Sequence, residues 1–96
     1  MSSERISLDD VFVRHGEEVG MERGMFIIAL SEEKAFGLSP LAYVVWYMCD
    51  GRLPLRAVVE NIAENANVDA NTVEKRVLEV VQELMRVGLL TKKQVS

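Results

Sequence analysis

The chain has 96 residues, of which 49% are hydrophobic and 27% charged, and it carries a net charge of −4 and a single cysteine. This length predicts one small domain with a compact core, and one cysteine excludes an internal disulfide. The longest nearly apolar run, residues 41–49, is far shorter than the roughly 20 residues of a membrane span. Because the N-terminus is polar and carries no readable secretory signal, we expect a cytoplasmic protein without a membrane partner.

The acidic side chains are concentrated in the first half of the chain. Residues 1–50 contain nine acidic and four basic side chains, whereas residues 51–96 contain six and seven. A domain that binds nucleic acid usually displays a basic face, because phosphate contacts drive its affinity. The charge distribution therefore argues against a nucleic-acid partner.

Three short segments in the first half have the patterns of β-strands. Residues 11–14 alternate between apolar and polar faces, and a polar, glycine-containing break follows at 16–20. Residues 24–30 are rich in β-formers, and residues 34–38 alternate again after the turn-sized "SEE". We expect a hairpin between 25–30 and 34–38, and a three-stranded meander for the whole.

The second half of the chain is predicted to be helical, and its first helix has clear ends. Ser39 is a typical N-cap and Pro40 suits the first helical position, where its missing N–H costs nothing. The run 41–49 is apolar on all sides, which indicates a buried helix. Asp50 and Gly51 then form a corner, with Gly51 expected at positive φ.

Two further helices are expected at about 54–65 and 72–87. The last has a wide apolar stripe and ends at Gly88, after which "LL" and "TKK" form a short edge strand or trail off. Its start has two competing registers, Asn71 with Glu74 or Asp69 with Thr72. The core stripe consists of Val73, Val77, Val80, Val81, Leu84 and Val87.

Together these elements predict an α+β fold, winged-helix-like, with a three-stranded antiparallel β-meander followed by a three-helix bundle. A single domain spans 1–96, with a core of about 10–90 and flexible tails at 1–9 and 91–96. The residues expected to shape its corners are Ser39, Pro40, Asp50, Gly51 and Gly88.

One flank of the last helix is more apolar than a single core requires. Leu78 and Met85 lie roughly 100° from the middle of the stripe, next to Lys75 and Gln82. Two interpretations stay open: the first strands cover this flank, or it is an exposed apolar groove.

No catalytic, metal-binding or cofactor-binding pattern is present. His15 has no second histidine or cysteine at metal-ligand spacing. Cys49 has no neighbouring histidine and follows an apolar run, so we expect a buried, inert thiol. We therefore predict a protein that is not an enzyme.

The segments "ALSEEKAFGLSPLAYVVWYMCDGRLPLRAVVENIAE" and "VEKRVLEVVQELMRVGLL" combine a hairpin, a capped apolar helix ending in "DG" and a last helix ending in "GLL". These features resemble the PqqD-like family, the peptide chaperones named for coenzyme PQQ synthesis protein D. The resemblance covers about residues 25–90, and "DG" and "GLL" carry most of it.

The resemblance implies a leader-peptide recognition domain, which binds the leader of a ribosomally made precursor peptide and presents it to a modifying enzyme, typically a radical-SAM enzyme. The peptide would add as a strand to the third strand and lie against the third helix. The helix positions that we assign to this site come from the helical wheel. In this chain the site maps onto Lys34, Ala35, Phe36, Gly37 and Leu38, and onto Lys75, Leu78, Gln82 and Met85. A long connector, "NANVDAN", and a heavy "YVVWYM" depart from the family pattern and leave the pathway open.

Two other functions stay open. A winged-helix DNA-binding or transcriptional domain fits the fold, but the last helix has three glutamates against three basic residues. A structural subunit that forms a homodimer through the same strand edge is the second alternative.

Overall fold

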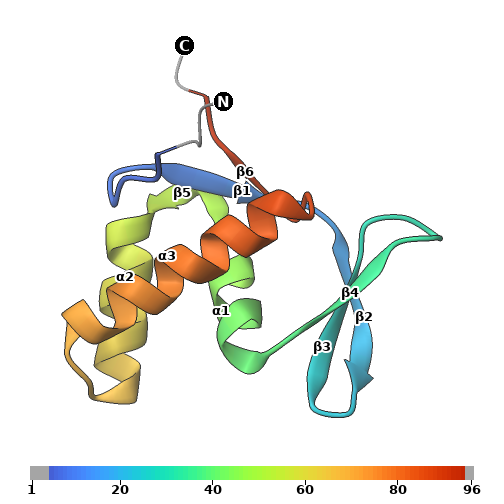
Figure 1. The fold of residues 1–96 in the computed structure, drawn as a ribbon, viewed down its shortest axis with the longest axis horizontal. Helices are drawn as coiled ribbons and strands as arrows, with labels where there is room; N and C mark the ends of the chain where they lie inside the picture. Colours follow the sequence, from blue (N-terminus) through green and yellow to red (C-terminus); the bar gives the residue numbers. More distant parts are fainter. Residues whose placement is uncertain (1–4, 95–96) are drawn as a thin grey trace.

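The computed structural model describes residues 5–94, which form six strands and three helices (Figure 1). The strands make two antiparallel sheets of three strands each, in the orders β2–β3–β4 and β5–β1–β6. The predicted α+β fold, in which a meander precedes three helices, is confirmed. In chain order the elements are β1 Val11–Arg14, β2 Glu17–Glu22, β3 Met25–Ala29, β4 Ala35–Leu38, α1 Pro40–Met48, β5 Asp50–Pro54, α2 Leu55–Ala66, α3 Ala70–Arg86 and β6 Leu90–Lys92.

The first strand of the meander is β2, not the predicted segment 11–14. A two-residue turn joins Glu22 to Met25, and both of its residues are left-handed, with φ 53° at Arg23 and 78° at Gly24. Two left-handed residues form the type of hairpin turn that matches the twist of the flanking strands. The dipeptide Arg-Gly is a weaker sequence signal for this turn than Asn-Gly. The predicted break at 16–20 was therefore wrong, because most of it belongs to an exposed strand.

The second sheet joins segments that are distant in the sequence. β1 is its central strand and pairs with β5 on one side and with β6 on the other. Gly51 has φ 85°, as expected, but residues 50–54 form a strand as well as a corner. The alternative in which the residues after Gly88 form an edge strand is confirmed by β6.

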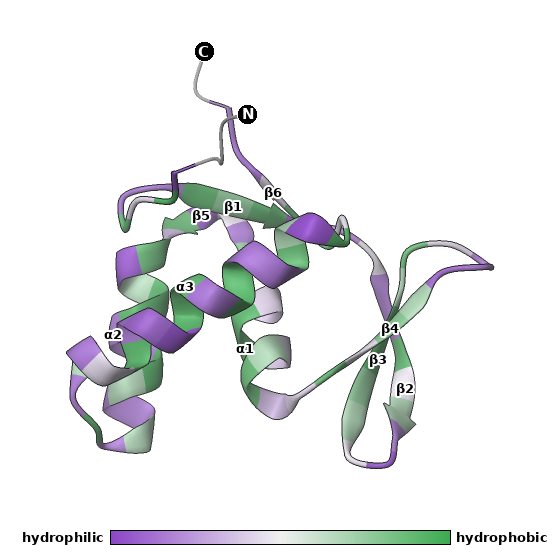
Figure 2. Ribbon diagram, viewed as in Figure 1, coloured by the Kyte–Doolittle hydropathy of each residue, from purple (hydrophilic) through white to green (hydrophobic). Residues whose placement is uncertain are grey.

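The helices begin and end close to the predicted residues. Ser39 caps α1, its Oγ accepting from the backbone N–H of Ala42 at 3.2 Å, and Pro40 is the first helical residue. α3 starts after Asp69, so the register with Asp69 at the N-cap is confirmed and the one that starts at Asn71 is wrong, although the side chain of Asp69 makes no cap bond. It ends before Gly88, whose φ is 87°. α3 packs on α1 and α2, and colouring by hydropathy separates its apolar stripe from its polar outer face (Figure 2).

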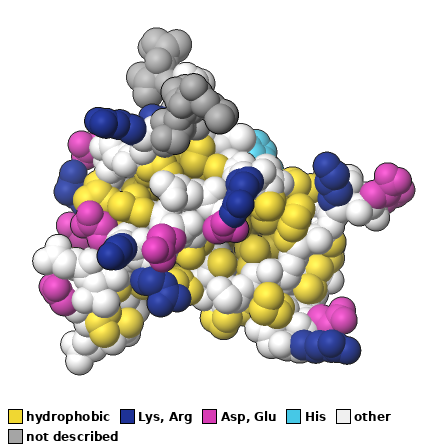
Figure 3. Space-filling model, in the orientation of Figure 1, with side chains coloured by type: hydrophobic (Ala, Val, Ile, Leu, Met, Phe, Trp, Pro, Cys, Tyr) yellow, Lys and Arg dark blue, Asp and Glu magenta, His cyan; other side chains and the backbone are white. Residues whose placement is uncertain are grey.

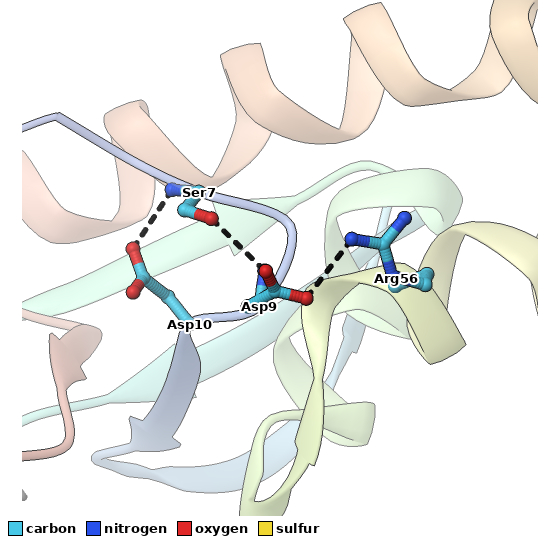
Figure 4. A network of polar contacts seen from close by, with 4 residues as sticks. All are labelled: Ser7, Asp9, Asp10 and Arg56. Carbon is cyan, nitrogen blue, oxygen red and sulfur yellow. Dashed lines mark hydrogen bonds and ion pairs between the residues drawn. The ribbon is translucent and has the colours of Figure 1, made fainter.

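The segment before β1 is attached to the start of α2. The backbone carbonyls of Leu8 and Asp10 accept from the N–H groups of Arg56 (2.8 Å) and Leu55 (2.9 Å). These bonds satisfy helical N–H groups that Pro54, the N-cap, cannot satisfy with a side chain. An ion pair of 2.9 Å between Arg56 and Asp9 lies beside them (Figure 4).

The extent of the domain stays a prediction. Residues 1–4 and 95–96, which belong to the predicted tails, lie outside the described residues. Within 5–94, no helix is both long enough and apolar enough to cross a bilayer.

Candidate functional site

Among the described residues 5–94, the strand β4 has one edge without a partner strand. In this part of the chain it pairs only with β3, and the N–H of Leu30 donates to the carbonyl of Lys34 at 2.8 Å, just before β4 begins. In an antiparallel ladder every second pair exchanges hydrogen bonds, so the next two bonded residues of β4 are Phe36 and Leu38. The N–H and C=O groups of Ala35 and Gly37 therefore point to the free edge.

The two faces of β4 have different surroundings. Leu38 is buried and Phe36 is half-buried, on the face that the sheet turns toward the helices. Gly37 belongs to the opposite face, where an added β-carbon would lie 3.3 Å from Cε of Met25. Its small size therefore relieves crowding against Met25 across the outer face of the sheet, rather than at the free edge.

A groove of about 410 Å³ lies between β4 and α3. Hydrophobic surface fills the space between α3 and the sheet on this side of the molecule, with charged side chains on the α3 side (Figure 3). The residues lining the groove are Phe36, Gly37, Leu38, Ser39 and Ala42 on one side, and Arg76, Glu79, Val80, Glu83, Leu84 and Val87 on the other.

The α3 wall of the groove is a ridge of alternating character. Arg76, Val80, Glu83 and Val87 follow each other at intervals of three or four residues, which places them on one side of the helix. Val80 and Val87 are half-buried, whereas Arg76 and Glu83 are exposed. The ridge thus offers apolar contacts at depth and charges at the rim.

The helix residues predicted for the site lie on the other flank of α3. The lining of the groove contains none of Lys75, Leu78, Gln82 and Met85. By the helical wheel, Leu78 is turned roughly 160° from Val80. Leu78 and Met85 are half-buried and pack against the core, so this flank is partly covered.

A helical wheel fixes the angles between side chains, but not which flank faces the sheet. That choice depends on how α1 positions β4 against α3, and this is a non-local contact. The sequence pattern places the ridge residues Val80 and Val87 in the core stripe. Arg76, Glu79 and Glu83 belong to the balanced charges of this helix, and no local signal assigns them to a groove wall.

The family model described as Coenzyme PQQ synthesis protein D (PqqD) matches residues 25–90 of the 96-residue chain. The chain belongs to the PqqD family. Comparison with curated proteins and with solved structures gave no match.

The PqqD match runs from β3 to the first residue of β6, so it includes both walls of the groove and leaves out β1 and β2. PqqD proteins are non-catalytic accessory proteins related to PQQ biosynthesis, and they act with protein partners.

In this PqqD-family chain, Tyr43 attaches the sheet to α1. Its ring stacks on Phe26 with centroids 4.0 Å apart, and its hydroxyl donates to Oε1 of Glu18 at 2.7 Å. That hydrogen bond is the main reason why the pKa of Tyr43 is raised. Trp46, also on α1, donates from Nε1 to the carbonyl of His15 at 3.0 Å, between the two sheets. Through these contacts α1 anchors the sheet that contains β4, and the sequence did not indicate this role of Tyr43.

Cys49 and His15, the two residues considered as candidates for catalysis or metal binding, make contacts within the fold. Cys49 is buried, and burial, with a smaller effect of the neighbouring Asp50, raises the pKa of its thiol to about 12. Nε2 of His15 lies 2.7 Å from Oγ1 of Thr91. Among residues 5–94, no group of three His, Cys, Asp or Glu side chains could hold a metal ion.

Proposed function

We propose that this PqqD-family protein is a peptide chaperone without catalytic activity, which binds the leader of a ribosomally made precursor peptide as an added strand on β4. The observation that carries the proposal is the free edge at Ala35 and Gly37, which borders an apolar groove. An incoming strand would bond to these backbone groups, and alternate side chains would enter the groove.

The groove suits an extended peptide better than a compact ligand. Its lining follows β4 over Phe36, Gly37 and Leu38, and it is apolar at Phe36, Leu38 and Val80. Backbone bonds would supply affinity that depends little on sequence, whereas the side chains that face the floor would supply specificity. We expect dissociation constants in the micromolar range or below.

The bound peptide would be presented to a modifying enzyme, of the radical-SAM type or another, in the cytoplasm. The pathway is PQQ biosynthesis or the modification of another peptide. In either case the chemistry would belong to the enzyme, and this chain would need neither a catalytic group nor a cofactor.

The test is a titration with the precursor peptide encoded beside the gene, followed by backbone amide shifts. We expect shifts at residues 35–38 and along 76–87, with little change in α2. Shifts confined to other segments would contradict the assignment of the site.

A matched pair of variants decides which flank of α3 is used. Val80→Ser alters the groove wall, and Leu78→Ser makes a comparable change on the opposite flank; both residues are half-buried. We expect only Val80→Ser to weaken peptide binding beyond its effect on stability. A larger loss for Leu78→Ser would restore the flank of Lys75, Leu78, Gln82 and Met85 as the peptide wall.

A homodimer is a second candidate, because the same free edge of β4 could pair with a second copy. Sedimentation with and without peptide separates the two functions. A monomer in both conditions argues against the dimer, whereas a dimer that dissociates as peptide is added shows that both use one surface. DNA binding is disfavoured, since Glu79 and Glu83 are exposed on α3, and a mobility-shift assay at low salt tests it.

A further inference from the structure

The two walls of the groove run in opposite directions. A β-carbon added at Gly88, just after α3, would lie 3.6 Å from Cδ1 of Leu30. The backbone N–H of Leu30 in turn donates a hydrogen bond to the carbonyl of Lys34, the residue immediately before β4. The C-terminal end of α3 is therefore near the N-terminal end of β4 (Figure 1). A strand added antiparallel to β4, the pairing used throughout this sheet, would run in the same direction as α3.

The charges on the α3 wall are ordered along that direction. Arg76 comes first, and Glu79 and Glu83 follow at rises of about 4.5 and 10.5 Å along the helix axis. In an extended strand, side chains two residues apart point to the same face and lie about 6.8 Å from each other. This distance falls between the two rises along the helix. Glu83 also pairs with Arg86, whereas within residues 5–94 Arg76 and Glu79 have no ion-pair partner.

We propose that the groove selects peptide strands in which an acidic side chain precedes a basic one by two residues. This inference rests on the proposed function and names the class of peptide that the same site takes. The acidic side chain would lie opposite Arg76 and the basic one opposite Glu79 and Glu83. The apolar stem of a lysine or arginine would pass along Val80. The reverse order would place like charges together at both positions.

The test is a selection from a displayed library of peptides of about ten residues, in which Asp, Lys, Thr and Val are drawn at every position. The unmodified chain should enrich the order Asp-x-Lys over Lys-x-Asp. Purified pairs of peptides that differ only in this order should differ roughly three- to tenfold in Kd at low salt, and less at high salt.

A charge-swap variant provides the decisive comparison. In Arg76→Glu/Glu79→Arg the preferred order should reverse while the net charge of the chain stays the same. The matched control is Arg52→Glu/Glu60→Arg, which swaps two exposed charges outside the groove lining and should keep the original order.

The outcomes separate this inference from the proposed function. Library peptides that bind without a charge order, with the reverse order, or with an order that the groove swap leaves unchanged would overturn the inference and leave strand addition in place. Failure of all library peptides and of the precursor peptide to bind would overturn both.

Discussion

Within the described part of the chain, the sheet β2–β3–β4 has two free edges, and their side chains and register differ. β2 carries Glu17, Glu18 and Glu22 and is interrupted by a register shift between Glu18 and Gly20. Charges and bulges are the devices by which proteins prevent edge strands from pairing. β4 has no charged side chain and an unbroken register, and its free edge borders the groove on α3. The edge at β2 is thus protected against pairing with another strand. The edge at β4, beside the groove, lacks these features and can accept an added strand.

Placing proline on each edge in turn tests this difference most strongly. The N–H groups of Ala35 on β4 and Met21 on β2 both point to a free edge, so a proline there leaves the sheet's own hydrogen bonds intact. Ala35→Pro removes a donor that an added strand needs and should weaken peptide binding by about 3 kcal/mol, or roughly 150-fold in Kd. Calorimetric titration of the precursor peptide measures this.

Met21→Pro is the matched control and should leave peptide affinity unchanged. Equal losses for the two variants would mean that the edges are equivalent. A loss for Met21→Pro alone would move the site to β2.

A change outside both edges separates stability from binding. Gly51 has φ 85°, a region that a β-branched residue resists, so Gly51→Val should lower the free energy of unfolding by on the order of 1 kcal/mol or more. Peptide affinity at a temperature where the variant stays folded should not change. Urea denaturation and the same titration measure the two quantities, and unaltered stability would show that φ is not positive at Gly51 in solution.

Adding a charge to the open edge should make it resemble the protected one. Ala35→Lys keeps the backbone N–H that strand addition uses, but places a charge beside an incoming strand. We expect peptide binding to weaken by about 0.5 kcal/mol. Tighter binding of a peptide without acidic residues would contradict the view that charge protects these edges.

The rate at which the buried thiol of Cys49 is alkylated shows whether the edge variants remain folded. Since burial raises the pKa of Cys49 to about 12, almost no thiolate forms at pH 8, and iodoacetamide should react far more slowly than with the unfolded chain. Ala35→Pro and Met21→Pro should retain this slow rate, as judged by mass spectrometry. A rate near that of the unfolded chain would assign their effects on binding to unfolding.

Local features of the sequence predicted much of this fold. Ser39 and Pro40 mark the start of α1, Gly51 takes the positive φ expected of it, and Gly88 follows the end of α3 as expected, because each feature depends only on a few neighbouring residues. The hairpin of β3 and β4 was also predictable, since a short polar turn separates two β-forming runs.

Non-local features could not be predicted in the same way. The pairing of β1 with β5 and β6 joins residues that are far apart in the chain. The local sequence of Asp50–Pro54 contains no pattern that predicts this pairing. The groove-facing flank of α3 depends on contacts such as that of Tyr43 with Phe26. The strand with the free edge was therefore predictable from the sequence, but the flank of α3 that lines the groove was not.

Amide hydrogen exchange with and without the precursor peptide tests strand addition on β4 most directly. The amides of Phe36 and Leu38 already donate within the sheet, whereas those of Ala35 and Gly37 point to the free edge. We predict that peptide slows exchange at Ala35 and Gly37, and leaves the amide of Met21 on β2 unchanged. Peptide binding that protects Met21, or that leaves Ala35 and Gly37 exchanging as before, would contradict the account.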